Sequence, residues 1–327
     1  MNRSEKLLRI CHLTVSYATE LEGPLRAVDG VELALDSGEI LGLLGESGCG
    51  KSTLAAAIPR LIANNANVET GEIWFQGSNV MALGENALRE VRGRQIAIIS
   101  QDPTLALNPV LTAGRQISEA ILAHEALSAT QRRERVLELL GEVGFVRPQE
   151  IYAAYPHQLS GGQRQRIVIA QAIASKPALL IADEPTSKLD ASLQQDILKL
   201  LSQIREHHGT AVLVVTHDPA SVAILADRIA VMYAGRIVET GTTTELFSRP
   251  LHPYTRALVE IARAAFAVLP ARALPAIDGE SPNPARFPRG CRFEPRCSDR
   301  MEICVKQDPA MFWPEPNRPV SCFKYGQ

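Results

Sequence analysis

The segment GESGCGKST at residues 45–53 constrains the fold of this chain more than any other part of its sequence. It fits the pattern G-x-x-x-x-G-K-[ST], and it stands between a short apolar run (39–45) and the helical run TLAAAIPRLI. Glycines let the backbone N–H groups of such a loop turn inward onto phosphates, and the following helix N-terminus adds partial positive charge. We therefore predict a strand, a phosphate loop and a helix, with Lys51 reaching the β- and γ-phosphates and Ser52 ligating Mg²⁺. The residues expected to bind the nucleotide in this loop are Gly45, Glu46, Ser47, Gly48, Cys49, Gly50, Lys51, Ser52 and Thr53.

Two further apolar runs end in residues suited to phosphate chemistry. The run ALLIADEP ends with Asp183 and Glu184, and the run VLVVTHD ends with His217. In sheets of this kind ligands bind beyond the carboxyl ends of the strands. Beside a phosphate loop, Asp183 is expected to reach Mg²⁺, Glu184 to polarise the attacking water, and His217 to contact the γ-phosphate.

Composition limits the class of protein. The chain has 327 residues, 34 basic and 36 acidic, so its formal net charge of −2 gives no sign of nucleic-acid binding. No apolar run is long enough to span a membrane, and the N-terminal residues lack the apolar stretch of a signal peptide. We expect a cytosolic protein that reaches a membrane only through partners.

The order of apolar and amphipathic runs predicts an α/β fold. Nearly continuous apolar runs are typical of parallel strands that are buried on both faces, and helices between them would cover the sheet. A helical subdomain is expected as an insertion at about residues 85–158, with Val136, Leu139, Leu140 and Val143 on one apolar face and Ser128 or Thr130 as cap. The expected strands are 7–15, 31–37, 39–45, 71–77, 178–184 and 210–218, and the other expected helices are 161–175, 191–207 and 219–226.

Five more motifs, in their order along the chain, resemble those of the ABC ATPase family. LSGGQ at residues 159–163 reads as the family's signature without a mismatch, and TSKLD at 186–190 resembles its D-loop. Gln101 is placed as the Q-loop glutamine, Tyr17 as the aromatic residue that stacks on adenine, and His217 follows the D-loop. The resemblance covers about residues 5–250. It implies an ABC-type ATPase domain at residues 1–250. ATP would be bound by Tyr17 and the phosphate loop, and Mg²⁺ by Ser52, Gln101 and Asp183.

The resemblance also implies how the subunit assembles. Two nucleotide domains would form a head-to-tail dimer, in which the signature of one subunit closes over ATP on the phosphate loop of the other. A helix N-terminus behind the signature suits contact with a γ-phosphate. The signature residues are Leu159, Ser160, Gly161, Gly162 and Gln163, and Asp190 belongs to the D-loop. Lys188 departs from the common S-A-L-D form of that loop, and the sequence leaves open whether it pairs with an acidic residue or faces solvent.

The C-terminal part, residues 251–327, is predicted to be a small irregular extension. Ten prolines fall between Pro270 and Pro319, and periodicity is lost. The segment 246–263, with its His-Pro-Tyr-Thr sequence, resembles the one that follows the nucleotide domain in ATPases of peptide and nickel importers, and QDPTLALNPV (101–110) resembles the same subgroup. An ATPase subunit of a di- or oligopeptide importer is therefore expected. The alternatives are an importer of nickel or another small solute and a non-transport ABC ATPase.

Partners follow from that resemblance. They are a second, homologous but different ATPase subunit, two transmembrane permease subunits and an extracytoplasmic peptide-binding protein. The chain would lie on the cytoplasmic face of the inner membrane as a peripheral subunit.

Four cysteines are concentrated at the C-terminus, namely Cys291, Cys297, Cys304 and Cys322. In a reducing compartment such a group favours a metal over disulfides, and both Zn²⁺ and an iron–sulfur cluster suit four thiolates. None of the spacings is as short as C-x2–4-C, which is usual for structural zinc. In the peptide-importer ATPases that the tail resembles, such cysteines hold a [4Fe–4S] cluster.

Cys49 stands within the phosphate loop, two residues before Lys51. It can be a small side chain that takes the place of a serine. The alternative is a reactive thiol, because a helix N-terminus and a lysine both lower a thiol pKa. That alternative predicts inactivation by thiol reagents and protection by MgATP.

Overall fold

The phosphate loop joins β3 (Ile40–Leu44), in which every residue is buried, to the helix α1 (Lys51–Ala57). The computed structural model describes residues 6–19, 23–266 and 276–326. The predicted ranges 1–250 and 251–327 therefore include stretches outside the described residues: 1–5, 20–22, 267–275 and 327. The chain divides into a first unit (1–36, 40–82 and 215–327) and a second unit (37–39 and 83–214).

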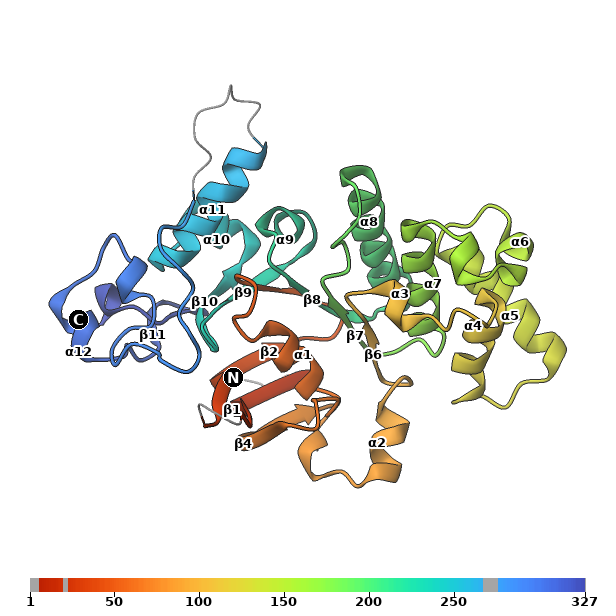
Figure 1. The fold of residues 1–327 in the computed structure, drawn as a ribbon, viewed down its shortest axis with the longest axis horizontal. Coiled ribbons are helices and arrows are strands. Elements are labelled where there is room, and N and C mark those ends of the chain that lie inside the picture. Colours follow the sequence, from red (N-terminus) through yellow and green to blue (C-terminus); the bar gives the residue numbers. More distant parts are fainter. Residues whose placement is uncertain (1–5, 20–22, 267–275, 327) are drawn as a thin grey trace. The chain divides into compact units, whose positions relative to one another are not determined.

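The first unit contains an antiparallel sheet of N-terminal strands in the order β2-β1-β4-β5. Alternation along β4 places Ile73 and Phe75 inside and Trp74 outside, as a sheet with one covered face requires. In Figure 1 these strands are red to orange. Their bounds are β1 (Leu8–Tyr17), β2 (Leu25–Leu35), β4 (Ala66–Phe75) and β5 (Ser78–Asn79), followed by the 3-10 turn η1 (Val80–Ala82).

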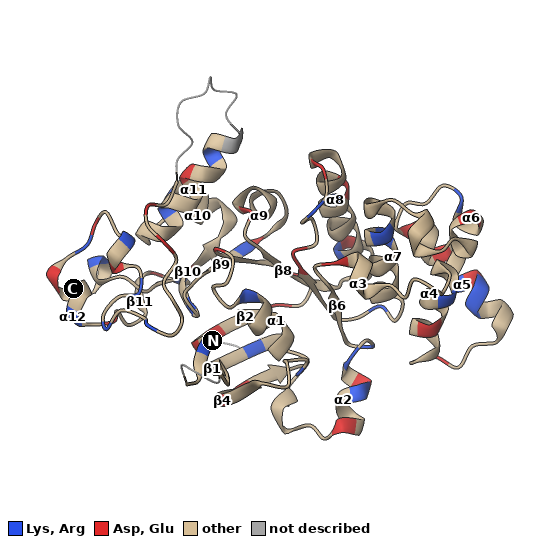
Figure 2. Ribbon diagram, in the orientation of Figure 1, with Lys and Arg blue, Asp and Glu red and all other residues tan. Residues whose placement is uncertain are grey.

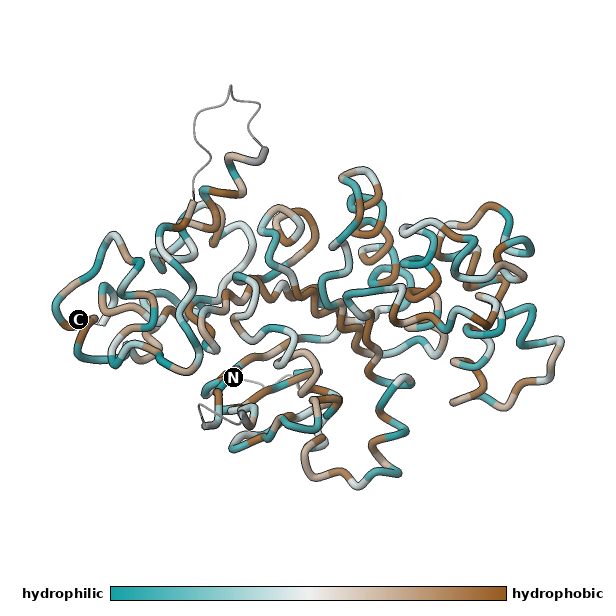
Figure 3. The backbone as a smooth tube through the Cα atoms, viewed as in Figure 1, coloured by the Kyte–Doolittle hydropathy of each residue, from teal (hydrophilic) through white to brown (hydrophobic). Residues whose placement is uncertain are grey.

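The rest of the first unit surrounds β3. The strand order there is β11-β12-β10-β9-β3; β3 and β9 are parallel, and the other pairs are antiparallel. Figure 3 shows hydrophobic stretches in the middle of this sheet, where β3 and β9 are buried, whereas the N-terminal strands mix hydrophobic and hydrophilic residues. The elements are α9 (Pro219–Leu225), β9 (Arg228–Tyr233), β10 (Arg236–Thr242), α10 (Thr243–Ser248), α11 (Pro253–Phe266), η3 (Glu294–Arg296), α12 (Glu302–Lys306), β11 (Phe312–Glu315), β12 (Arg318–Val320) and η4 (Phe323–Tyr325).

The C-terminal segment is more regular than its composition predicts. Its strand β12 pairs with β10, with Val320 opposite Glu239, and β11 pairs with β12. Leu251, Val320 and Cys322 form a small buried cluster against which Tyr325 packs. A proline-rich segment that cannot build a core by itself thus gains order by adding strands to an existing sheet.

The second unit contains the parallel pair β6 (Ile96–Ile99) and β7 (Leu179–Asp183), with β8 (Ala211–Thr216) as the next strand. The chain passes from this unit into the first within β8. Figure 2 shows charges of both signs along the helices, whereas β6 and β8 carry none. The helices are α2 (Glu85–Val91), α3 (Pro103–Ala106), α4 (Ala113–Leu122), α5 (Ala129–Glu142), α6 (Pro148–Ala153), η2 (Pro156–Gln158), α7 (Gly161–Ile173) and α8 (Ala191–His208).

The region in which the helical subdomain was expected, about 85–158, also contains one strand. Ile96–Ile99 pairs in parallel with β7, from Ile96 opposite Leu179 to Ile99 opposite Ala182. The sequence analysis did not predict this strand, because only burial against a sheet decides the state of so short an apolar run. The predicted apolar face of α5 is confirmed, since its four residues are fully buried, and Ser128 caps that helix through a capping box.

Candidate nucleotide-binding site

Two positions of the phosphate loop lie so close to neighbouring backbone that only glycine fits there. A Cβ at Gly45 would lie 2.2 Å from the carbonyl oxygen of Met232. Gly50 has a φ of 106°, and a Cβ there would lie 2.0 Å from the carbonyl oxygen of Ala27. A side chain at either position would displace backbone, so the loop keeps its form because these positions are glycine.

The side chain of Lys51 folds back onto the phosphate loop. It is buried, and Nζ donates to the carbonyl oxygens of Gly45 at 2.8 Å and Glu46 at 2.9 Å. The ammonium group thus lies within the loop without a carboxylate partner among the described hydrogen bonds. Phosphate oxygens can replace the two carbonyls as acceptors, which fits the predicted role of Lys51.

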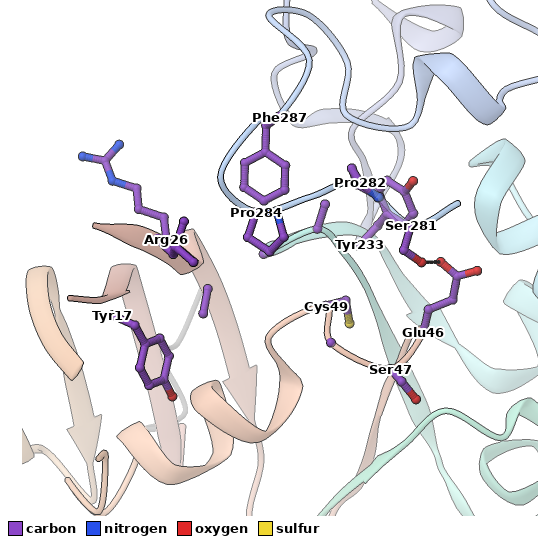
Figure 4. A pocket seen from close by; sticks show the side chains of 15 residues that line it. Tyr17, Arg26, Glu46, Ser47, Cys49, Tyr233, Ser281, Pro282, Pro284 and Phe287 are labelled. Carbon is purple, nitrogen blue, oxygen red and sulfur yellow. Dashed lines mark hydrogen bonds between the residues drawn. The ribbon is translucent and has the colours of Figure 1, made fainter. Parts of the chain in front are cut away.

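Tyr17 lies at the end of β1 and contacts the helix that follows the loop. Its hydroxyl is 3.0 Å from Oγ1 of Thr53, so the structure brings these two predicted site residues together. Tyr17 also lines a cavity of about 180 Å³ beside the loop (Figure 4). The other lining residues are Leu25, Arg26, Ala27, Glu46, Ser47, Gly48, Cys49, Tyr233, Ala234, Gly235, Ser281, Pro282, Pro284 and Phe287.

Residues far along the chain hold Glu46, which the sequence analysis did not anticipate. Arg296 donates to both carboxylate oxygens of Glu46, at 2.6 and 2.8 Å, and the Ser281 hydroxyl donates at 2.9 Å. The backbone N–H of Glu46 donates to the hydroxyl of Tyr254 at 2.8 Å. Burial alone would raise the pKa of Glu46, but the hydrogen bonds from Arg296 and Ser281 outweigh it and hold that pKa below its usual range. Tyr254 belongs to the His-Pro-Tyr-Thr segment, which the sequence analysis singled out only for its resemblance to peptide and nickel importers.

The lowered thiol pKa that the hypothesis of a reactive Cys49 requires is not found. The side chain is 7% exposed, and burial raises the pKa of its thiol although the nearby Lys51 acts in the opposite direction. The distance from Lys51 Nζ to Cys49 Sγ is 3.9 Å. The structure therefore favours the alternative interpretation, in which Cys49 is a small packing residue.

His217 directly follows β8 and belongs to the first unit. That unit therefore contains Tyr17, the phosphate loop and His217. The side chain of His217 is exposed, and the next residue, Asp218, caps α9 by accepting from the N–H groups of Ala220 and Ser221. The end of this strand is therefore fixed by a helix cap that begins one residue after His217.

The second unit holds the remaining predicted residues. Gln101 is exposed directly before the cap of α3, while Asp183 ends β7. Glu184 is buried in the left-handed region with a φ of 50°, a conformation that costs a non-glycine residue energy and is common at functional sites. Asp183 and Glu184 both follow the buried strand as predicted.

The LSGGQ segment forms the start of α7. The Ser160 hydroxyl accepts from the N–H of Gln163, and the Gln163 side chain accepts from the N–H of Ser160. Gly162 is buried against Leu193, where a Cβ would lie 3.1 Å from a leucine methyl group. The segment is thus a capped helix start whose N-terminus carries Ser160 and Gly161 at an exposed surface.

The D-loop resolves the question about Lys188. Its Nζ pairs with Asp102 Oδ2 at 2.6 Å, while Asp190 caps α8 by accepting from the N–H of Leu193. Hydrogen bonding and the charge of Lys188 lower the pKa of Asp102. Because Asp102 follows Gln101, the ion pair connects the D-loop with the Q-loop inside one chain.

The four C-terminal cysteines line one small cavity of about 10 Å³. Burial, together with repulsion from the other three thiols, raises the pKa of Cys291 to about 11. Among residues 6–19, 23–266 and 276–326, however, no three His, Cys, Asp or Glu side chains are arranged to hold a metal ion. The expected cluster is therefore not supported by the positions of the thiols.

Comparison with known proteins gives consistent matches along the chain. Residues 28–187 match the family described as ABC transporter, and residues 238–304 match that described as oligopeptide/dipeptide transporter, C-terminal region. The oligopeptide transport ATP-binding protein AppD of Bacillus subtilis is 39% identical over 98% of this chain and 97% of its own length. The dipeptide transport ATP-binding protein DppD of the same bacterium is 42% identical over 99% of this chain and 96% of its own length.

Solved structures share the fold. An ATP-binding cassette solved as a dimer in a post-hydrolysis state, with ADP and Pi, is 30% identical, with a TM-score of 0.65 over 72% of this chain and 98% of its own. The cbiO1 protein of Clostridium perfringens, part of an ABC transporter complex, is 25% identical, with a TM-score of 0.66 over 80% of this chain and 96% of its own. Within the described residues, no helix has the length and apolar character needed to cross a membrane.

Proposed function

Because the chain belongs to the family of peptide ABC transporter ATP-binding proteins, we propose that it binds and hydrolyses ATP to power the import of di- and oligopeptides. One observation carries the proposal: the phosphate loop and the peptide-transporter C-terminal region occur in one chain that aligns with such relatives over nearly its whole length. The experiment is reconstitution with the permeases and binding protein, where peptide should stimulate ATP hydrolysis. Absence of that stimulation with every di- and oligopeptide tried would remove the peptide assignment.

The residues supply the parts that phosphoryl transfer to water requires. Lys51 and the loop N–H groups would bind the phosphates of ATP. Ser52, Gln101 and Asp183 offer oxygen ligands of the type that Mg²⁺ prefers, and the ion would neutralise charge on the phosphates. This assignment rests on residue type and on order along the chain.

Glu184 is proposed as the residue that polarises the attacking water, and His217 as a contact to the γ-phosphate. A general base of this kind contributes roughly 10²–10⁴-fold to the rate. Glu184→Gln keeps the size of the side chain and removes its basicity. The variant should bind ATP normally and hydrolyse it at least about a hundredfold more slowly. Near-normal hydrolysis in the assembled transporter would exclude this role.

The proposed assembly pairs this chain with a second, homologous ATPase in a head-to-tail dimer. The exposed α7 N-terminus, with Ser160 and Gly161, would face ATP on the partner. The partner permeases would dock near α3, where Leu105 is 86% and Val110 is 74% exposed. Two large, exposed apolar side chains within one short segment favour a protein contact there. Cross-links from Leu105→Cys to permease loops would support it, and cross-links confined to the C-terminal segment would exclude it.

We also propose, from the resemblance and from the shared cavity, that the four C-terminal thiols bind a [4Fe–4S] cluster, with Zn²⁺ as the alternative. As the thiols lie, they do not form a metal site, so binding requires them to move closer together. Iron, acid-labile sulfide and zinc should be measured in anaerobically purified protein. A protein free of all three would exclude both metals.

A further inference from the structure

The cavity beside the phosphate loop is bordered by a segment of the C-terminal extension. Ser281, Pro282, Pro284 and Phe287 line it together with the loop residues and Tyr17. In Figure 4, Pro284 and Phe287 project from this segment near the loop that carries Cys49, and Tyr17 stands on the neighbouring strand. The cavity thus adjoins the phosphate loop, and its walls include three aromatic rings, those of Tyr17, Tyr233 and Phe287.

Phe287 is held in place before any ligand binds. The guanidinium carbon of Arg292 lies 4.1 Å from the centre of the Phe287 ring, as in a cation–π contact. Arg292 in turn donates to the carboxylate of Asp29 and, at 2.5 Å, to the carbonyl oxygen of Ala234. Burial lowers the pKa of Arg292 to about 10, so it stays charged at neutral pH. One face of the ring is therefore occupied by a fixed cation.

The same segment is connected to the phosphate loop. Ser281 donates to Glu46, and Arg296 forms two hydrogen bonds to the same carboxylate while its own side chain is 5% exposed. Arg296 also donates to the backbone carbonyl oxygen of Asp278 at 2.9 Å. The wall of the cavity and the loop that would bind the phosphates are thus fixed relative to each other through Glu46.

We propose that residues 281–287 form a second wall of the ATP site, beside Tyr17, and that Phe287 contacts the base. The inference rests on the proposed ATP binding and adds the residues that recognise the base. A planar aromatic base gains dispersion and quadrupole contacts with an aromatic ring, whereas a phosphate chain gains none. The position of the cavity next to Ser47 and Gly48 places a base here when the phosphates lie on the loop.

The experiment compares two ligands on the full-length chain. Phe287→Ala should weaken the binding of MgATP about two- to tenfold, the range expected for one aromatic contact. Its affinity for magnesium tripolyphosphate, which has the phosphates but no base, should equal that of the parent. Phe287→Tyr should bind MgATP as the parent does. Trp313→Ala is the matched control, because Trp313 is an aromatic residue of the same extension, is 64% exposed and does not line this cavity.

The measured affinities distinguish a contact between Phe287 and the base from damage to the phosphate loop. Unchanged MgATP affinity in Phe287→Ala overturns the inference, and so does an equal loss for both ligands, which indicates a damaged loop. If Phe287→Ala fails to fold, Phe287→Trp serves instead: its added fluorescence should change with MgATP and not with tripolyphosphate, and an identical response to both overturns the proposal. A parent chain that does not bind MgATP refutes the proposed function itself, which keeps the two failures distinct.

Discussion

Arg318→Met is expected to detach the C-terminal strands from the sheet. Arg318 is 1% exposed, and Glu239, its partner on β10, is 0% exposed. The Glu239 carboxylate accepts from Arg318 at 3.2 Å and from the N–H groups of Leu251 and His252 at 2.9 and 2.8 Å. The substitution leaves a buried carboxylate with two backbone donors and no cation, while methionine fills most of the volume.

The expected cost is about 3–5 kcal/mol, the range for removing one partner of a buried ion pair. The assay is amide hydrogen exchange of peptides from β10 and β12. It measures the free energy of local opening of these strands, which is the quantity that the substitution should change. An opening free energy lower by that amount accelerates exchange roughly 10²- to 5 × 10³-fold, since about 1.4 kcal/mol corresponds to a factor of ten. The double variant Glu239→Gln with Arg318→Met should recover part of the loss, since no buried charge then remains.

Arg249→Met is the matched control for this test. Arg249 also pairs with a glutamate of the extension, Glu315, but its side chain is 66% exposed. An exposed pair contributes about 0–1 kcal/mol, so exchange should change less than about fivefold. If Arg249→Met and Arg318→Met accelerate exchange equally, or if neither does, the argument from burial is incorrect.

The remaining predictions concern the loop and the D-loop. Lys51→Ala should weaken MgATP binding itself, measured by equilibrium dialysis, and an unchanged affinity would contradict its contact with phosphate. Iodoacetamide should label Cys49 more slowly than the half-buried Cys11 in the nucleotide-free protein, because burial raises the pKa of Cys49; peptide mass spectrometry that finds Cys49 labelled first would contradict the structure. Lys188→Ala should raise the NMR-measured pKa of Asp102 toward its ordinary value without a change in melting temperature, and an unaltered pKa would show that the ion pair is absent in solution.

Local patterns were sufficient to predict the elements that carry the motifs. The apolar runs around Leu41, Ile181 and Val214 are strands, as predicted. The strand state of such runs follows from burial on both faces of the sheet, and this burial can be recognised in the sequence as a nearly continuous run of apolar residues. The strand Ile96–Ile99 was not predicted because four apolar residues between helical segments suit either state, and only pairing with β7 decides between them.

The C-terminal side of the site could not be predicted, because its contacts are long-range and its sequence has no period. Arg296 reaches Glu46 across 250 positions, and Arg292 reaches Asp29 across 263. No local rule selects these arginines from the other charged residues of the extension. Only Tyr254, in a segment already singled out, could have drawn attention to the loop.

Cys49 shows why charge alone predicted the wrong state of a thiol. Two neighbours of Cys49 in the sequence lower a thiol pKa, namely the helix N-terminus and Lys51. In the structure Lys51 still lowers the pKa of Cys49, but burial of the thiol acts in the opposite direction and is the larger effect. A Cβ on Gly45 would lie 2.9 Å from the sulfur, so the thiol packs closely against the loop. Loss of hydration then exceeds the remaining attraction, and the loop gains a neutral side chain that does not compete with phosphate for its lysine.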